Sequence, residues 1–67
     1  MYKTNRIPRK FKQIIGTFLS GNCEGKRMVI TKDDRGYHGR DEDGKMWYVS
    51  VWVLRVPEAF QIESIEI

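Results

Sequence analysis

The sequence is poor in the residues with which small proteins strengthen a fold. It has one cysteine, Cys23, one histidine, His38, and two prolines among 67 residues. A single cysteine excludes an internal disulfide and a zinc site built from several thiolates. A chain of this length buries only about 60% of the surface that its unfolded form exposes. We therefore expect one small domain from a reducing compartment, with no metal or cofactor, to which a partner could add stability.

Long apolar runs are also absent. No stretch approaches the roughly 18 apolar residues of a membrane span, and residues 1–12, MYKTNRIPRKFK, have no apolar core of a signal peptide. The sequence thus predicts a cytoplasmic protein that contacts no membrane. A pocket needs several convergent polar groups, for which so short a chain has little room. We therefore expect no small-molecule substrate and no enzymatic activity.

Charge is divided unevenly along the chain. The net charge is +3, but residues 1–12 hold five cations and no acid, while the remaining 55 residues hold seven bases and nine acids. The last eleven residues carry three glutamates and no base. Pro8 disfavours helix at the residue before it, so residues 1–10 are predicted to be an extended basic arm. Residues 11–67 would then form the domain.

Residues 11–20, FKQIIGTFLS, admit two structures. Their apolar residues fall at the spacing of an amphipathic helix that would run over residues 8–20. Gly16 and Thr17 in the middle would weaken that helix by roughly 1 kcal/mol or more. As a strand, residues 14–20 are rich in β-branched and aromatic side chains, and Gly16 would mark a bulge or a bend. The strand is favoured because the rest of the chain repeats at strand-and-turn spacing.

The segments that follow show the two-residue period of strands. In residues 26–32, Met28 and Ile30 face one way, as in a half-buried strand. Residues 33–36, DDRG, are typical of a turn that begins with an aspartate bonded to the backbone and ends with glycine. After a short strand over residues 37–40, the sequence DEDG predicts the turn of a β-hairpin.

The apolar run of residues 45–53 contains both tryptophans. Alternation predicts that its odd positions face the core, namely Trp47, Val49, Val51 and Val53. Its even positions, Met46, Tyr48 and Trp52, are too apolar to stand wholly in water, so we expect the arm, the C-terminal segment or a partner to cover them. Farther on, the apolar residues change phase, which predicts a bulge near residues 63–64 or a short helical turn starting at Pro57.

Residues 36–58, GYHGRDEDGKMWYVSVWVLRVPE, resemble the second half of a small SH3-like barrel of the short-looped, Tudor-like or KOW-like kind. The ALYDY-type opening of peptide-binding SH3 domains is absent. The resemblance implies a single 3₁₀ turn over residues 51–54 with Leu54 pointing inward. The predicted fold is therefore all-β, a small barrel of four to five antiparallel strands with a basic N-terminal arm. The alternative is an α+β fold, with residues 8–20 a helix packed on a three- to four-stranded antiparallel sheet.

Residues that could carry catalysis or bind a metal are few. His38 could act as a general base oriented by Asp33 or Asp41, but a surface strand histidine is the favoured interpretation. Cys23 could serve as a nucleophile only if the fold brought it to His38. The DEDG turn is similar to the middle of a calcium-binding loop, but Met46 and Trp47 occupy the positions where further ligands would be needed. We predict no catalytic residue and no metal site.

Binding is better supported. The cations of the arm could neutralise phosphates of a nucleic acid, and they are Lys3, Arg6, Arg9, Lys10 and Lys12. Aromatic and apolar residues of the hairpin could contact bases or a protein, and they are Tyr37, Met46, Tyr48 and Trp52. We predict a non-enzymatic module that binds nucleic acid or a nucleic-acid-associated protein complex. The alternatives are a protein-interaction module or small inhibitor of the kind that phages and mobile elements encode, and a homodimeric structural protein.

Overall fold

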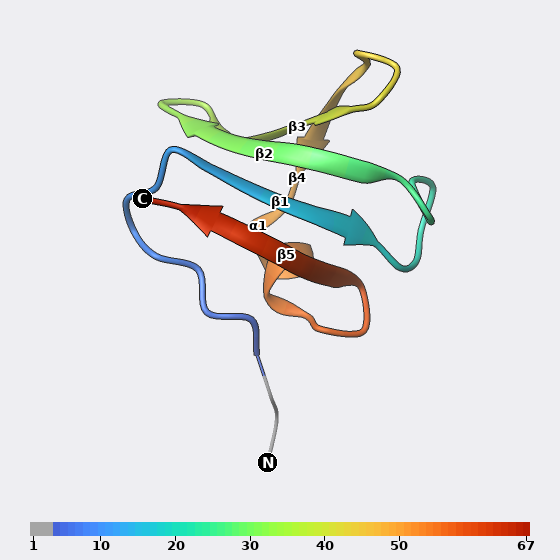
Figure 1. Cartoon of the computed structure of the whole chain (residues 1–67), viewed down its shortest axis with the longest axis horizontal. Coiled ribbons are helices and arrows are strands. Elements are labelled where there is room, and N and C mark those ends of the chain that lie inside the picture. Colours follow the sequence, from blue (N-terminus) through green and yellow to red (C-terminus); the bar gives the residue numbers. More distant parts are fainter. Residues whose placement is uncertain (1–3) are drawn as a thin grey trace.

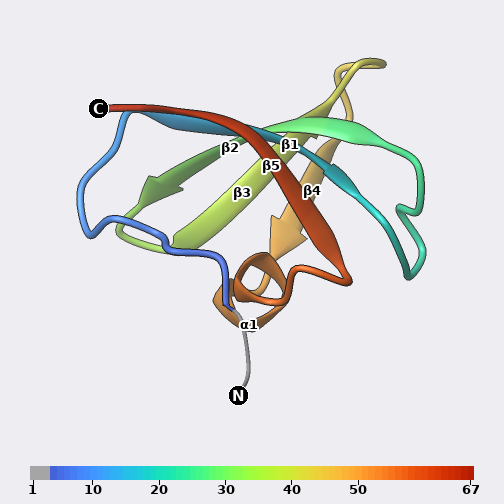
Figure 2. The ribbon, with the colours of Figure 1, turned by 60° about the horizontal axis from the view of Figure 1, so that its bottom comes forward.

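The computed structural model describes residues 4–67, which form one antiparallel sheet and one short helix (Figure 1). The elements are β1 (Gln13–Phe18), β2 (Arg27–Asp33), β3 (Gly36–Asp41), β4 (Met46–Val49), α1 (Val51–Arg55) and β5 (Phe60–Glu66). The strand order is β4-β3-β2-β1-β5. The predicted all-β fold is confirmed. The sheet is not closed into a barrel, because β4 and β5 stand at its two edges; instead it curves over α1, as Figure 2 shows.

Strand β1 settles the ambiguity of the first apolar segment. Its side chains alternate between buried and half-buried, so Ile14 and Phe18 enter the core from one face. The favoured strand is therefore confirmed, and the alternative helix over residues 8–20 is wrong. A helix would leave one face of the segment without partners, whereas β1 pairs with β2 on one side and β5 on the other. Gly16 permits this pairing, because a Cβ there would overlap the ring of Phe60 and the carbonyl oxygen of Gln61.

The predicted bulge in the last strand is confirmed. Ile15 pairs with Ser64 and Gly16 pairs with Ile62, so Glu63 has no counterpart on β1. The extra residue changes the phase of β5. As a result, Ile62 and Ile65 both pack against the core although they are three positions apart, an odd spacing that would put them on opposite faces of a regular strand.

The apolar run of residues 45–53 is split between two elements. Strand β4 ends at Val49, and the Oγ atom of Ser50 accepts the N–H of Trp52 at 3.2 Å, which caps the first turn of α1. The prediction of Val53 as a core residue is wrong, since 36% of it is exposed. The helical period replaces strand alternation there and points Leu54 inward, where it is fully buried, as the resemblance predicted.

The core lies between the concave side of the sheet and α1. Its fully or almost fully buried members are Ile14, Phe18, Met28, Ile30, Leu54 and Phe60. Every strand except β3 and β4 thus supplies a buried apolar side chain, and those two contribute half-buried ones, including Tyr37, Trp47 and Val49. Val51, also predicted for the core, is half-buried in the first turn of α1.

Candidate functional site

The N-terminal arm, which in the structure extends to residue 12 because β1 begins at Gln13, is fastened to the folded domain. The backbone N–H of Asn5 donates to the carbonyl of Arg55 at 2.9 Å, and its side-chain Nδ2 donates to the carbonyls of Leu54 and Phe60, each at 2.8 Å. Farther along, the N–H of Lys12 donates to the carbonyl of Glu66 at 2.7 Å. The arm therefore runs from the end of α1 to the end of β5, as the blue segment in Figure 2 shows.

Apolar side chains of the arm add to these hydrogen bonds. Ile7 and Phe11 are half-buried and pack against the core. The ring of Phe11 also stacks on Tyr37, with 6.2 Å between the ring centroids. The arm thus covers part of the concave side of the sheet, and its backbone has a defined course from Asn5 onward.

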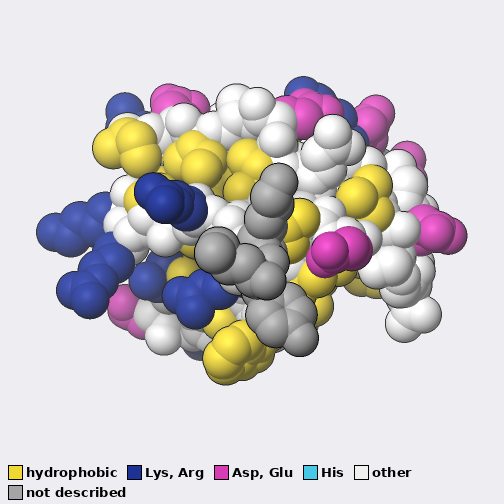
Figure 3. Space-filling view, turned by 90° about the horizontal axis from the view of Figure 1, so that it is seen from below, with side chains coloured by type: hydrophobic (Ala, Val, Ile, Leu, Met, Phe, Trp, Pro, Cys, Tyr) yellow, Lys and Arg dark blue, Asp and Glu magenta, His cyan; other side chains and the backbone are white. Residues whose placement is uncertain are grey.

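The predicted cations of the arm point outward. Arg6, Arg9, Lys10 and Lys12 are all exposed, while Lys3 lies outside the described residues. Within residues 4–67, none of these four cations forms a salt bridge. Figure 3 shows Lys and Arg side chains gathered at one side of the face seen from below, with hydrophobic side chains beside them. The course of the arm thus concentrates positive charge on one part of the molecule.

Helix α1 extends this basic region and adds an aromatic ring. Trp52 is 72% exposed, and Arg55, three residues later, is exposed as well. Residues three apart on a helix are surface neighbours. The carbonyl of Arg55 accepts the N–H of Asn5, so the backbone of Arg6, the next residue of the arm, starts beside the end of α1. We call the combined region the arm–α1 surface, and its residues are Arg6, Arg9, Lys10, Lys12, Trp52 and Arg55.

Two of the predicted partner-binding residues lie elsewhere, on the convex side of the sheet. Tyr48 is 85% exposed and pairs with His38, and the exposed Met46 pairs with Arg40, so all four side chains share one face. The rings of His38 and Tyr48 meet edge to face at 5.2 Å. We call this region, defined by His38, Arg40, Met46 and Tyr48, the outer β3–β4 face.

Tyr37 does not belong to that face. It pairs with Val49, so alternation places it on the concave side, where it packs against the core and stacks on Phe11. Lys32 lies over the same ring, with its Nζ 5.5 Å from the ring centroid. Tyr37 and Tyr48 therefore lie on opposite sides of the sheet, because Tyr48 pairs with His38, the residue next to Tyr37.

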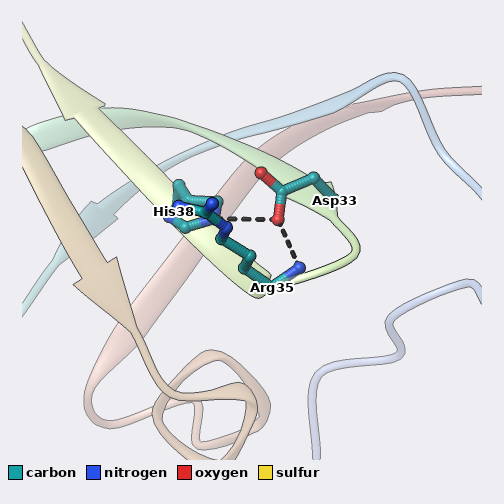
Figure 4. Close-up of polar contacts among 3 residues, drawn as sticks. All are labelled: Asp33, Arg35 and His38. Carbon is teal, nitrogen blue, oxygen red and sulfur yellow. Dashed lines mark hydrogen bonds and ion pairs between the residues drawn. The ribbon is translucent and has the colours of Figure 1, made fainter.

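His38 is part of a turn rather than an open site (Figure 4). Its Nε2 lies 3.0 Å from Oδ1 of Asp33, and the same oxygen accepts the N–H of Arg35 at 2.7 Å. The hydrogen bond from Arg35 and then that from His38 lower the pKa of Asp33. The side chain of His38 is only 12% exposed. The predicted turn with a bonded aspartate is confirmed, and it holds the imidazole in place.

The lone cysteine lies in a different part of the molecule. Cys23 lines an apolar hollow of about 330 Å³ with Trp47, Val53 and Ala59, and His38 does not border it. Burial raises the pKa of the Cys23 thiol above its ordinary value. A raised pKa disfavours the thiolate that nucleophilic attack requires. The structure therefore does not bring Cys23 to His38, as a nucleophile and its base would require.

The acidic turn is occupied by its own hydrogen bonds. Oδ1 of Asp41 accepts the N–H groups of Asp43 and Lys45, each at 2.9 Å, and Oδ2 accepts the indole N–H of Trp47 at 2.9 Å. The bond from Trp47, more than any other, lowers the pKa of Asp41. Over residues 4–67, no three His, Cys, Asp or Glu side chains are grouped so that they could hold a metal ion. DEDG is thus a structural turn that also fixes one tryptophan.

Sequence reasoning identified the arm and Trp52 separately but missed Arg55 and the contact that joins them. Two features of the sequence could have indicated this contact, namely the helical turn expected at residues 51–54 and Asn5 at the start of the arm. Comparisons with family models, curated proteins and solved structures yielded no match to this chain. In the part of the chain that the structure describes, no helix is long and apolar enough to cross a membrane.

Proposed function

We propose that this chain is a small, non-enzymatic binding module of the cytoplasm whose ligand is nucleic acid, alone or within a protein complex. The ligand contacts the arm–α1 surface. The observation that carries this proposal is the group of exposed arm cations, which no salt bridge within residues 4–67 neutralises. Phosphates would displace the counterions of these side chains, and the released ions favour binding.

The fastening of the arm supports the proposal further. A free basic tail pays conformational entropy when a ligand orders it. Here Asn5 and Lys12 already bind the folded domain through four hydrogen bonds, so the cations between them start from a defined backbone. Preorganisation of this kind lowers the cost of binding.

Charge reversal tests the proposal. Replacing Arg6, Arg9, Lys10 and Lys12 by glutamate should abolish retention on immobilised heparin and on single-stranded DNA at moderate salt. Each phosphate contact contributes about one to the slope of log affinity against log salt. The single variant Arg9→Glu should therefore flatten that slope, whereas the matched variant Arg40→Glu, on the outer β3–β4 face, should leave it unchanged. Unchanged retention of the fourfold variant would remove the proposal.

A second function is favoured by the outer β3–β4 face. Tyr48 and Met46 are exposed side by side on β4, an edge strand of the sheet. Exposed apolar residues on a sheet edge are typical of protein contacts, including contacts between two copies of one chain. This alternative is a protein-interaction module or small inhibitor, or a homodimer. Tyr48→Ala would then lose a captured protein, or sedimentation would show a dimer; monomeric sedimentation at high concentration would exclude the homodimer.

A further inference from the structure

Packing against the core does not explain the position of Trp52. Its side chain is 72% exposed and is not among the residues packed against the core. The capping bond from Ser50 uses only the backbone N–H of Trp52, and Leu54 is the residue that anchors α1. Trp47, in contrast, is half-buried and bonded to Asp41. The fold therefore requires a tryptophan at position 47 but not at position 52.

The surroundings of Trp52 point to the ligand. Arg55 lies one helical turn away on the same face, and its carbonyl holds Asn5, which Arg6 follows. The ring thus stands one helical turn from Arg55, and the segment that carries the arm cations is bonded to the carbonyl of that arginine. Figure 3 shows, more generally, hydrophobic side chains bordering Lys and Arg side chains on the face seen from below. An aromatic ring with cations beside it can stack a base and contact the adjoining phosphates.

This arrangement suits an unpaired strand better than a duplex. In a duplex the bases are stacked on one another, so only their edges and the phosphates are accessible. Trp52 could then add little, and α1 is five residues long and anchored in the core by Leu54, so it cannot enter a major groove. In a single strand a base face is free to stack on an exposed ring, whatever the base.

We propose that the arm–α1 surface selects single-stranded nucleic acid, with a base stacked on Trp52 and the flanking phosphates on Arg55 and Arg6. This inference rests on the proposed function, since the cations supply affinity and Trp52 supplies the preference for an unpaired strand. The binding carries no preference for a particular base, because stacking needs only a base face.

The experiment compares three ligands with the full chain at fixed low salt. The ligands are a fluorescently labelled oligothymidylate of about 10 nucleotides, a labelled hairpin duplex with an equal number of phosphates, and heparin, a polyanion without bases. Fluorescence anisotropy gives each affinity. The variants are Trp52→Ala, the conservative Trp52→Phe, and the matched control Tyr48→Ala, which removes another highly exposed ring, from the outer β3–β4 face. Circular dichroism verifies that each variant folds.

The expected result is a loss of about tenfold in affinity for the oligothymidylate with Trp52→Ala, while affinities for the duplex and heparin stay unchanged. Trp52→Phe should recover part of the loss, and Tyr48→Ala should change nothing. Binding of the oligothymidylate should also quench tryptophan emission in the wild type. Equal affinities of wild type and Trp52→Ala for all three ligands would overturn the single-strand inference and leave the proposed function standing. Failure of the wild type to bind any of them would overturn both.

Discussion

The arm–α1 surface and the outer β3–β4 face each present one highly exposed aromatic residue, but in opposite settings. Trp52 lies one helical turn from Arg55, whose carbonyl binds the arm at Asn5. Within residues 4–67, neither Arg55 nor the cations Arg6, Arg9, Lys10 and Lys12 form a salt bridge. Tyr48 instead touches His38, whose imidazole is held by the carboxylate of Asp33. Exposure alone does not distinguish the two surfaces. The number of cations differs, because the arm–α1 surface holds five and the outer β3–β4 face holds Arg40 alone. This difference is why we propose a polyanion as the ligand of the first surface and a protein as the partner of the second.

The largest change in the free energy of unfolding is expected from the side chain that holds α1, and with it the arm–α1 surface, on the core. Leu54 is fully buried and is the side chain that anchors α1 in the core. Leu54→Ala should lower the free energy of unfolding by about 2–5 kcal/mol, because truncation of a buried leucine leaves a cavity. Urea denaturation measures this loss. The matched variant Val53→Ala alters a neighbour that is 36% exposed, and a similar loss there would contradict the assignment of Leu54 as the anchor.

A smaller effect is expected where the arm is attached. Asn5→Ala removes two side-chain hydrogen bonds to the carbonyls of Leu54 and Phe60. The free energy of unfolding should fall by about 1–2 kcal/mol, and affinity for heparin should fall although no cation is lost. The exposed loop variant Asn22→Ala serves as the control for urea denaturation and heparin chromatography. If Asn5→Ala matched the control in both, the arm would owe its position to Ile7 and Phe11 instead.

The secondary structure could be predicted from the sequence wherever a segment showed a single local preference. The change of phase in the last strand predicted, as one of two alternatives, a bulge near residues 63–64, and the bulge lies at Glu63. The Asp-Gly pair predicted the turn at Gly44. The run of residues 45–53 was harder, because β-branched and aromatic residues favour a strand throughout. Its division at Ser50 depends on a capping bond and on the core site that receives Leu54. Such a site exists only once the sheet has curved over α1.

The candidate site could be predicted only in part, because it joins residues that are far apart in the chain. The excess of cations in the arm is visible in the sequence, and so is the apolar surplus that includes Trp52. What links them is the amide of Asn5, which binds carbonyls 49 and 55 residues away. No spacing rule reports a contact of this range. Likewise, the separation of Tyr37 from Tyr48 follows from the strand register and not from their composition.

Acid should destabilise the protein through two carboxylates in the turns beside the outer β3–β4 face. Asp41 and Asp33 both have a folded-state pKa below the ordinary value, through the hydrogen bond from Trp47 in one case and from the N–H of Arg35 in the other. A carboxyl group with a lowered pKa stabilises the fold fully above its unfolded pKa, and this contribution is lost as the pH falls through the folded value. The free energy of unfolding should therefore be flat near neutrality and decline below about pH 5.

Asparagine variants separate the two carboxylates. Asp41→Asn should reduce the acid slope and also destabilise the protein at neutral pH, because one amide cannot accept from both the indole of Trp47 and the backbone N–H groups of the turn. Asp33→Asn, at an exposed position, should reduce the slope with less change at neutral pH. Urea denaturation over a series of pH values measures both effects. A slope unaltered in Asp41→Asn would place the acid sensitivity outside the turn that fixes Trp47.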